Sequence, residues 1–197
     1  VGRILEKLKD HSLANNTVII FTSDHGDWMG DHGLMQKALL HYQGLIRVPF
    51  IWVDPEEEKP GMVAPELACS QDIPNSILAR ASLAPCAGMQ GQDLTNLLFH
   101  GAISSRDGIL VQQTTAIPLP GDDRPTQVKT FVDHEWRLSY YLDKNWGELY
   151  NLKEDPDEIV NLWHAPEHQI IRLELMERML KSIVEGELLS PIQVNVG

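Results

Sequence analysis

The chain has 197 residues, 43% of them hydrophobic and 22% charged, which is enough for one sizeable core with a small appended sheet. Its formal net charge of -12 argues against general binding to nucleic acid or to an anionic membrane, because both require a basic face. No apolar run approaches the roughly 20 residues of a membrane-spanning helix. We therefore expect a globular chain with neither nucleic acid nor a membrane as its partner.

The opening of the chain predicts a helix followed by a buried strand. Residues 1–14 place Ile4, Leu5 and Leu8 at helical spacing, and these side chains are expected to face inward. Residues 17–22 form a β-branched and apolar run, which is typical of a strand buried on both faces of a parallel sheet covered by helices. A helix, a short turn and such a strand make up half of an α/β unit.

The same pattern continues further along the first part of the chain. A second buried strand is predicted over residues 48–53, and short helices are predicted over residues 72–81 and 93–99. We therefore expect residues 1–105 to form part of an α/β core.

The remaining residues, 106–197, predict a separate subdomain. Short apolar runs with turn-rich connections imply an antiparallel sheet of four strands. The predicted strands span residues 108–114, 127–133, 136–143 and 148–152. The clearest helical pattern of the chain, residues 167–184, is expected to cover one face of that sheet. Its predicted apolar stripe consists of Ile170, Leu173, Met176, Leu180 and Ile183.

Side chains with useful chemistry lie where the first strand is expected to end. Asp24 and His25 follow that strand directly, and Gly26 permits a tight exit. Ligands of open α/β sheets bind outside the carboxyl ends of strands, where a carboxylate and an imidazole can face one metal ion. Lys37 follows a glycine-containing loop. If this loop brings the lysine back to the carboxyl end of the strand, its ammonium would supply a positive charge for an anionic substrate.

Four sequence blocks carry a specific family resemblance. The first block contains Thr22-Ser23-Asp24-His25-Gly26-Asp27, Gly30-Asp31-His32-Gly33-Leu34, Lys37 and Arg47-Val48-Pro49. The others are Asp72-Ile73-Pro74-Asn75-Ser76-Ile77-Leu78, Gly88-Met89-Gln90-Gly91-Gln92-Asp93-Leu94, and Gly147-Glu148-Leu149-Tyr150-Asn151-Leu152 with Asp155-Pro156-Asp157-Glu158 and Asn161-Leu162. In this order they resemble sulfatases and phosphonate monoester hydrolases of the alkaline phosphatase superfamily. Asn75 and Asp93 depart from the family pattern, which usually has proline and serine there.

The resemblance implies a role for each of three residues. Asp24 and His25 match two ligands of the family's divalent metal, and Lys37 matches the lysine that contacts the sulfate or phosphate oxygens. Taken alone, an Asp-His pair at a strand end more often caps a turn, so the surrounding blocks carry this interpretation. Calcium is the metal expected from family frequency. The imidazole of His25 suits manganese or zinc better, and magnesium is a further alternative.

Two residues of the same loop are weaker candidates for substrate contact. Trp28 follows the candidate ligands closely and could line a substrate pocket. His32 could approach the site from the loop or satisfy local backbone groups, and the structural role is the favoured alternative.

The catalytic nucleophile of the family is missing from this sequence. That nucleophile is a cysteine or serine matured to formylglycine within a Cys/Ser-x-Pro-x-Arg motif, and neither Cys69 nor Cys86 fits it. The family's N-terminal pair of metal-binding aspartates is absent as well. We expect the missing part of the enzyme to precede Val1 and the isolated chain to be inactive.

The sequence thus predicts part of a metal-dependent sulfuric ester hydrolase that acts on an anionic ester. Its α/β fold is the C-terminal portion of an alkaline-phosphatase-like core followed by a four-stranded antiparallel sheet packed by a C-terminal helix. A phosphonate or phosphate ester hydrolase of the same superfamily is the close alternative. A non-catalytic interaction domain derived from this fold is the alternative of another class. A truncated core would expose apolar surface, so self-association into homo-oligomers is also expected.

Overall fold

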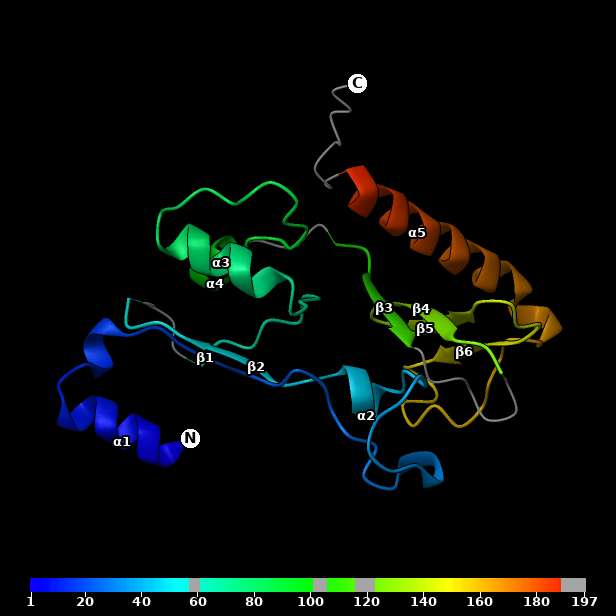
Figure 1. Ribbon diagram of the computed structural model, residues 1–197, viewed down its shortest axis with the longest axis horizontal. Helices are drawn as coiled ribbons and strands as arrows, with labels where there is room; N and C mark the ends of the chain where they lie inside the picture. Colours follow the sequence, from blue (N-terminus) through cyan, green and yellow to red (C-terminus); the bar gives the residue numbers. More distant parts are fainter. Residues whose placement is uncertain (57–60, 101–105, 116–122, 189–197) are drawn as a thin grey trace.

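The computed structural model describes residues 1–56, 61–100, 106–115 and 123–188 (Figure 1). The first part contains α1 (Gly2–Asp10), η1 (Ala14–Asn16), β1 (Ile19–Thr22), η2 (Asp31–Gly33), α2 (Gln43–Ile46), β2 (Phe50–Val53), α3 (Asp72–Arg80) and α4 (Thr95–His100). The second part contains β3 (Ile109–Thr115), β4 (Thr126–Val132), β5 (Trp136–Tyr141), β6 (Gly147–Asn151), η3 (Pro166–His168) and α5 (Gln169–Leu188). The predicted subdomain boundary after residue 105 borders residues 101–105, which lie outside the described residues.

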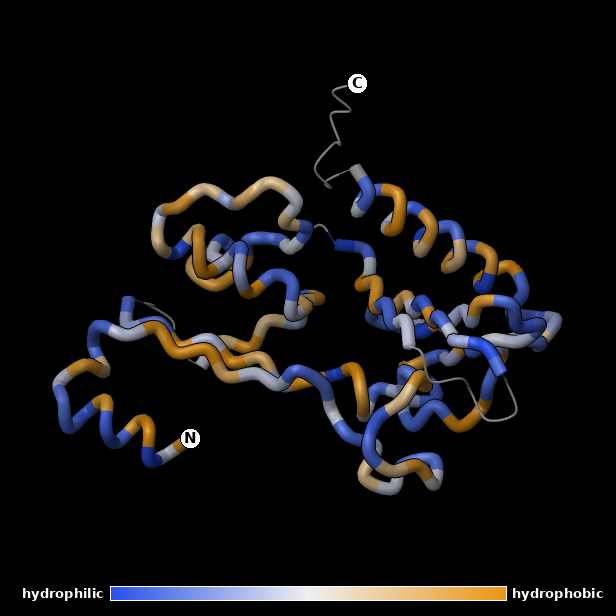
Figure 2. Tube along the Cα trace, in the orientation of Figure 1, coloured by the Kyte–Doolittle hydropathy of each residue, from blue (hydrophilic) through white to orange (hydrophobic). Residues whose placement is uncertain are grey.

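The two strands of the first part form an antiparallel pair, so the predicted parallel arrangement is wrong. Ile19 of β1 pairs with Val53 of β2, and Thr22 pairs with Phe50. Apolar composition favours burial but does not encode strand direction, and in the described residues each of these strands pairs only with the other. Their hydrophobic residues run side by side in Figure 2, and Phe21 is still 40% exposed. The pair is therefore a half-covered ribbon.

The first helix also differs from its prediction. Residues 2–10 are helical, but α1 contains no buried residue, and Ile4 is 68% exposed. The helical spacing of Ile4, Leu5 and Leu8 thus forms an apolar face that no described residue buries. Within the described residues, none of the helices is both long and apolar enough to cross a membrane.

The second part is the predicted antiparallel sheet, with its strands in the order β3-β4-β5-β6. Side chains of neighbouring strand residues alternate between the two faces, and each face is covered by a different part of the chain. One face packs against α5, which lies along the sheet in Figure 1. The core between them consists of Phe131, Leu138, Leu149, Trp163, Leu175 and Met179. The predicted fold of this part is confirmed.

The apolar stripe predicted for the last helix does not face the sheet as a unit. Leu175 is fully buried, whereas Ile170, Leu173 and Leu180 are 73%, 60% and 59% exposed. Met176 and Ile183 do pack against the core. The helix is apolar on more than one side, so helical spacing alone identified only part of the buried set.

Candidate anion and metal site

The chain leaves β1 through a tight turn that carries the candidate ligands. The Ser23 hydroxyl donates to the carbonyl of His25 at 2.8 Å, and the Gly26 amide donates to the carbonyl of Leu45 at 2.7 Å. A Cβ atom on Gly26 would lie 1.9 Å from the carbonyl oxygen of Gly44. Only glycine allows the two backbones to approach this closely, which anchors the turn on α2.

The side chains of Asp24, His25 and Lys37 meet at one point. Lys37 Nζ lies 2.7 Å from His25 Nε2, and His25 Nε2 lies 3.4 Å from Asp24 Oδ2. His25 Nδ1 is 2.6 Å from the carbonyl of Gly26, so Nδ1 carries the proton and Nε2 presents a lone pair to Lys37. The three residues that sequence reasoning singled out therefore lie in one cluster of side chains.

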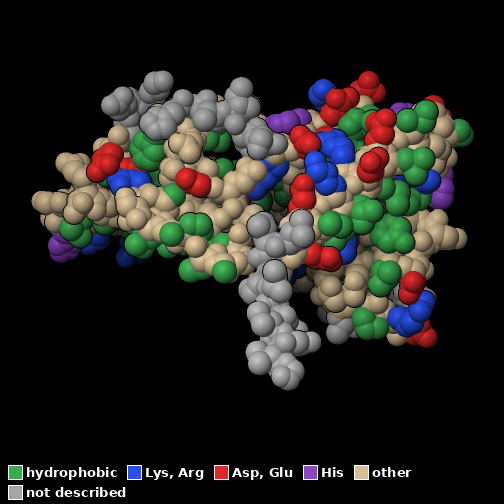
Figure 3. All heavy atoms as spheres, turned by 90° about the horizontal axis from the view of Figure 1, so that it is seen from above, with side chains coloured by type: hydrophobic (Ala, Val, Ile, Leu, Met, Phe, Trp, Pro, Cys, Tyr) green, Lys and Arg blue, Asp and Glu red, His purple; other side chains and the backbone are tan. Residues whose placement is uncertain are grey.

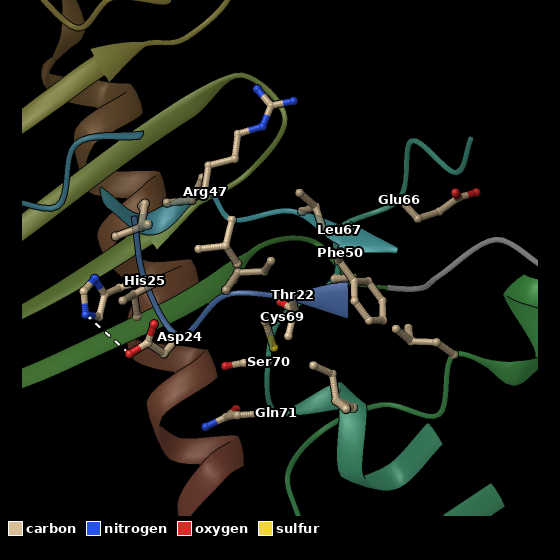
Figure 4. A pocket seen from close by; sticks show the side chains of 18 of the residues that line it. Thr22, Asp24, His25, Arg47, Phe50, Glu66, Leu67, Cys69, Ser70 and Gln71 are labelled. Carbon is tan, nitrogen blue, oxygen red and sulfur yellow. Dashed lines mark ion pairs between the residues drawn. The ribbon is translucent and has the colours of Figure 1, made fainter. Parts of the chain in front are cut away.

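The electrostatics of the turn favour an ionised carboxylate. Backbone N–H donation at His25 is the main cause that lowers the pKa of Asp24, and donation from its own backbone amide adds to it. The side chain of Asp24 is 85% exposed, so it faces solvent and is open to an incoming cation. Figure 4 shows Asp24 and His25 side by side where the chain leaves β1.

A loop closed by Asp27 returns Lys37 to the ligand pair. The Asp27 Oδ1 atom accepts hydrogen bonds from the backbone amides of Met29 at 2.8 Å and Gln36 at 3.1 Å. The amide of Trp28 donates to the carbonyl of Gln36 at 3.1 Å. Asp27 thus brings the two ends of the loop together, a turn role that aspartate often has.

The residue types fit a divalent cation, but two ligands are only part of a site. A carboxylate and a neutral imidazole are both good ligands for divalent metals, although a metal at His25 Nε2 would have to displace the Lys37 ammonium from that nitrogen. In the described part of the chain, no group of three or more histidine, cysteine, aspartate or glutamate side chains could hold a metal ion. Any further ligands would have to come from outside this set.

Asp24, His25 and Lys37 line a large open cavity of about 1690 Å³. Its wall also includes Thr22 at the end of β1 and Gln113 of β3, so both parts of the molecule contribute. Ligand pockets usually measure about 300–1,000 Å³, so this cavity is larger than a small substrate needs.

The two weaker candidates lie away from this cavity. Trp28 is buried, and it is not among the residues of the cavity wall. The His32 ring stacks on the Tyr42 ring at 3.7 Å between centroids, beside a second pocket that Asp31 and Glu158 also line. The loop therefore brings Lys37 to Asp24 and His25 but turns Trp28 and His32 elsewhere.

Sequence reasoning missed a buried group of charges on the second sheet. Arg137 is fully buried and forms ion pairs with Glu148 and Glu158. Burial opposes the charged form of Arg137, but the two carboxylates outweigh it and raise its pKa. The only signal in the sequence was that Glu148 and Glu158 belong to the fourth resemblance block, whose glutamates had no assigned role.

The fold has close counterparts among solved structures. A phosphonate monoester hydrolase of Agrobacterium radiobacter superimposes with a TM-score of 0.82 at 24% identity, over 94% of this chain and 38% of that chain. A protein solved in complex with its substrate D-glucosamine-2-N,6-O-disulfate superimposes with a TM-score of 0.83 at 24% identity, with the same coverage of 94% and 38%. The chain therefore shares its fold with these two proteins over most of its length.

Sequence comparison gives the particular family. The family model described as N-sulphoglucosamine sulphohydrolase, C-terminal, matches residues 30–185, and the chain belongs to this family. It is also 36% identical over 112 residues to an arylsulfatase of Clostridium perfringens (strain 13 / Type A), across 55% of this chain and 23% of that protein. The matched part of the chain thus spans about a quarter of the length of this relative.

Proposed function

We propose that this chain supplies part of the active site of a metal-dependent sulfuric ester hydrolase. Membership of the sulfatase C-terminal family supports this reaction class. The observation that carries the residue assignment is the meeting of Lys37 Nζ, His25 Nε2 and Asp24 Oδ2, joined by contacts of 2.7 and 3.4 Å. A metal cation and an ammonium group close together would stabilise the negative charge that a sulfate ester carries on several oxygens.

Asp24 and His25 would hold the divalent metal, together with ligands from outside the described residues. A bound metal would neutralise charge on the transferring group and orient it. Calcium is the first choice by family frequency, although the imidazole of His25 is a ligand that manganese and zinc prefer.

Lys37 would bind the anionic group of the substrate. Its ammonium is a compact charge with three donors and faces the cavity beside the ligand pair. Such a group stabilises negative charge on the equatorial oxygens in the transition state. The same lysine would serve a sulfate, phosphate or phosphonate ester, so it does not choose among them.

The isolated chain is expected to be inactive. None of its 197 residues belongs to a Cys/Ser-x-Pro-x-Arg motif, which would supply the formylglycine nucleophile. Loss of the nucleophile of a covalent catalyst typically costs on the order of 10⁶-fold in rate. Asp24, His25 and Lys37 would therefore bind and orient an anionic ester without cleaving it.

A phosphonate or phosphate ester hydrolase is the second candidate function. The specific observation that favours it is the shared fold with the phosphonate monoester hydrolase of Agrobacterium radiobacter, at a TM-score of 0.82. The curated relative with 36% identity over 112 residues is an arylsulfatase, which is why the sulfate ester is preferred.

Paired assays test these assignments. The isolated chain and the product of the full reading frame would each be given an aryl sulfate and a phosphonate monoester. We expect no turnover by the chain and preferential cleavage of the sulfate by the full product. Turnover by the chain would overturn the inactivity, and preference for the phosphonate would favour the second candidate. A full product that cleaves neither ester would point to a non-catalytic interaction domain.

A further inference from the structure

Arg137 is the centre of a buried polar cluster on the sheet face opposite α5. Its Nε donates to Glu158, and its Nη1 donates to Ser139 Oγ at 2.7 Å and to Glu148 Oε2 at 3.2 Å. Tyr141 donates from its hydroxyl to the same Glu148 oxygen at 2.7 Å. All five side chains are buried. We call Arg137, Ser139, Tyr141, Glu148 and Glu158 the Arg137 cluster.

The Arg137 cluster holds the segment that follows Lys37 through two direct hydrogen bonds. The single hydrogen of the Tyr141 hydroxyl is shared between Glu148 and the carbonyl of Leu39, which lies 3.3 Å from the hydroxyl oxygen. Glu158 Oε2 accepts the backbone amide of Gln43 at 2.6 Å, while its other oxygen accepts from Arg137. The two ends of residues 39–43 are thus fixed to one group of side chains.

Two further contacts hold the middle of the same segment. Thr130 Oγ1 lies 2.7 Å from Ser139 Oγ and 2.9 Å from His41 Nδ1. Thr130 therefore links the cluster to the buried side chain of His41. The guanidinium of Arg137 lies 5.1 Å from the centre of the Tyr42 ring, within cation–π range. Four of the five residues from 39 to 43 therefore contact the cluster directly or through one hydroxyl.

This arrangement is not one that stability alone would select. Buried ion pairs are often no more stabilising than well-packed apolar residues of similar size, so a buried guanidinium with two carboxylates is weak support for a purely stabilising role. Glu158 also adopts a left-handed backbone with φ of 56°, which a non-glycine residue keeps only when its surroundings hold it there. Both observations indicate that Glu158 is held in place by its hydrogen bonds to Arg137 and to the backbone amide of Gln43.

We propose that the Arg137 cluster is a positioning device for Lys37. Lys37 lies two residues before Leu39, so fixing residues 39–43 sets where the ammonium reaches. Its target is the Nε2 atom of His25, 2.7 Å away. The cluster contacts neither the metal ligands nor the anion, and acts on the reaction only through the backbone. This inference rests on the proposed role of Lys37 as the anion contact.

Glu158→Gln tests the proposal, with Asp157→Asn as the matched control at the neighbouring, exposed carboxylate. In the isolated chain, acetylation of Lys37 is followed by mass spectrometry, with exposed Lys9 as the internal reference. We expect Lys37 to react about fivefold faster in Glu158→Gln. The variant loses one hydrogen bond of the Arg137 cluster, which holds the segment that follows Lys37, and one hydrogen bond is worth roughly that factor. Hydrogen exchange should rise over residues 39–46 but not in β5. Unchanged Lys37 reactivity and exchange would overturn the proposal.

A kinetic measurement in the full reading-frame product separates positioning from simple stability. We expect Glu158→Gln to lower kcat by about ten- to a hundredfold, with KM within about twofold, because a displacement of about 1 Å has effects of this size. Asp157→Asn should match the unsubstituted enzyme. Lower stability with unchanged kcat would overturn positioning.

A milder variant covers the case in which Glu158→Gln does not fold. Tyr141→Phe keeps the ring and removes only the hydroxyl that reaches Leu39 and Glu148. It should raise Lys37 acetylation and lower kcat in the same direction, and wild-type behaviour would contradict the proposal. If the unsubstituted full product cleaves no ester, the proposed function fails, while acetylation and exchange still decide whether the cluster positions Lys37.

Discussion

Backbone contact at one glycine determines whether the candidate site can form. Gly26 lies between the ligand pair and the loop that carries Lys37, and its amide is bonded to Leu45. The sequence suggested a tight exit there, but the reason is the approach of the Gly44 carbonyl rather than an unusual φ. Since the same glycine joins β1 to α2, a change at this position would act on both ligands.

Gly26→Ala is expected to destabilise the protein by about 1–3 kcal/mol, the usual effect of overpacking. Its new Cβ would lie 1.9 Å from backbone oxygen, which cannot move without shifting α2. Gly2→Ala is the control, because a Cβ there meets nothing within 4 Å. Urea denaturation of the two variants measures the difference. Equal free energies of unfolding would show that the close approach is not maintained in solution.

His41 predicts a pH dependence of stability. Burial lowers its pKa below the ordinary 6.5, the charge of Arg137 acts in the same direction, and Gln113 and Glu148 oppose the shift. The unfolded chain therefore binds a proton at His41 more readily than the folded protein does. The stabilisation is complete above about pH 6.5 and is lost as the pH falls, because the unfolded state then takes up the proton.

Between about pH 7.5 and 5.5, His41→Gln should lose less stability than the unsubstituted chain, by up to about 1.4 kcal/mol per pH unit. His134→Gln, at an exposed histidine, should keep the original pH dependence. Denaturant unfolding at both pH values measures the effect. A His41→Gln curve parallel to that of the unsubstituted chain would show that His41 does not contribute.

In α5, the residues that helical spacing predicts to be buried differ from those that are buried in the structure. Leu175→Ala should lower the free energy of unfolding by about 2–5 kcal/mol, because Leu175 is 0% exposed in the core beneath the helix. Ile170→Ala should change it by only about 0.5 kcal/mol, because Ile170 is 73% exposed. Thermal or urea unfolding tests both, and the reverse ranking would restore the stripe predicted from helical spacing.

The approximate extents of the strands and of the longer helices were readable from the sequence, but their surroundings were not. Short apolar runs between turn residues placed β3 to β6 correctly, because an antiparallel meander is built from local contacts. The direction of β1 and β2 depends on long-range pairing, which composition does not encode. Helical spacing likewise could not tell the buried side of α5 from the exposed one, since apolar residues occupy both.

The candidate site was predictable where it depended on local sequence. Asp24 and His25 are adjacent, and the return of Lys37 depends on a loop closed by Asp27. The contribution of Glu158 was not predictable, because it acts on Gln43 from a distant part of the chain. The orientations of Trp28 and His32 depend on packing against the core and against Tyr42, which spacing cannot supply.

The whole molecule exposes much hydrophobic surface. Figure 3 shows hydrophobic side chains on the surface of both parts of the molecule. On the β1–β2 ribbon, Phe21, Ile51 and Val53 are 40%, 52% and 48% exposed, and α1 adds Ile4 at 68%. Apolar patches and open strand edges of this kind favour contact with another protein surface. A second copy of the chain can provide that surface.

We therefore expect the isolated chain to self-associate as its concentration rises, in sedimentation velocity experiments. Ile51→Lys should weaken the association, because it places a charge on the exposed ribbon. Ile170→Lys, on the exposed side of α5, is the comparison and should leave the association unchanged. A clean monomer at high concentration would contradict the expectation, and a stronger effect of Ile170→Lys would move the contact to the helix.

We have proposed that Asp24, His25 and Lys37 form one site for a metal and an anion. Paramagnetic broadening by a small amount of Mn²⁺, followed by NMR on the isolated chain, measures whether a cation binds there. We predict that the signals of these three residues broaden first and that Asp24→Asn abolishes the effect, because the carboxylate and the imidazole share one cation. Broadening confined to other acidic residues, with these three signals unchanged, would show that Asp24 and His25 do not bind the cation.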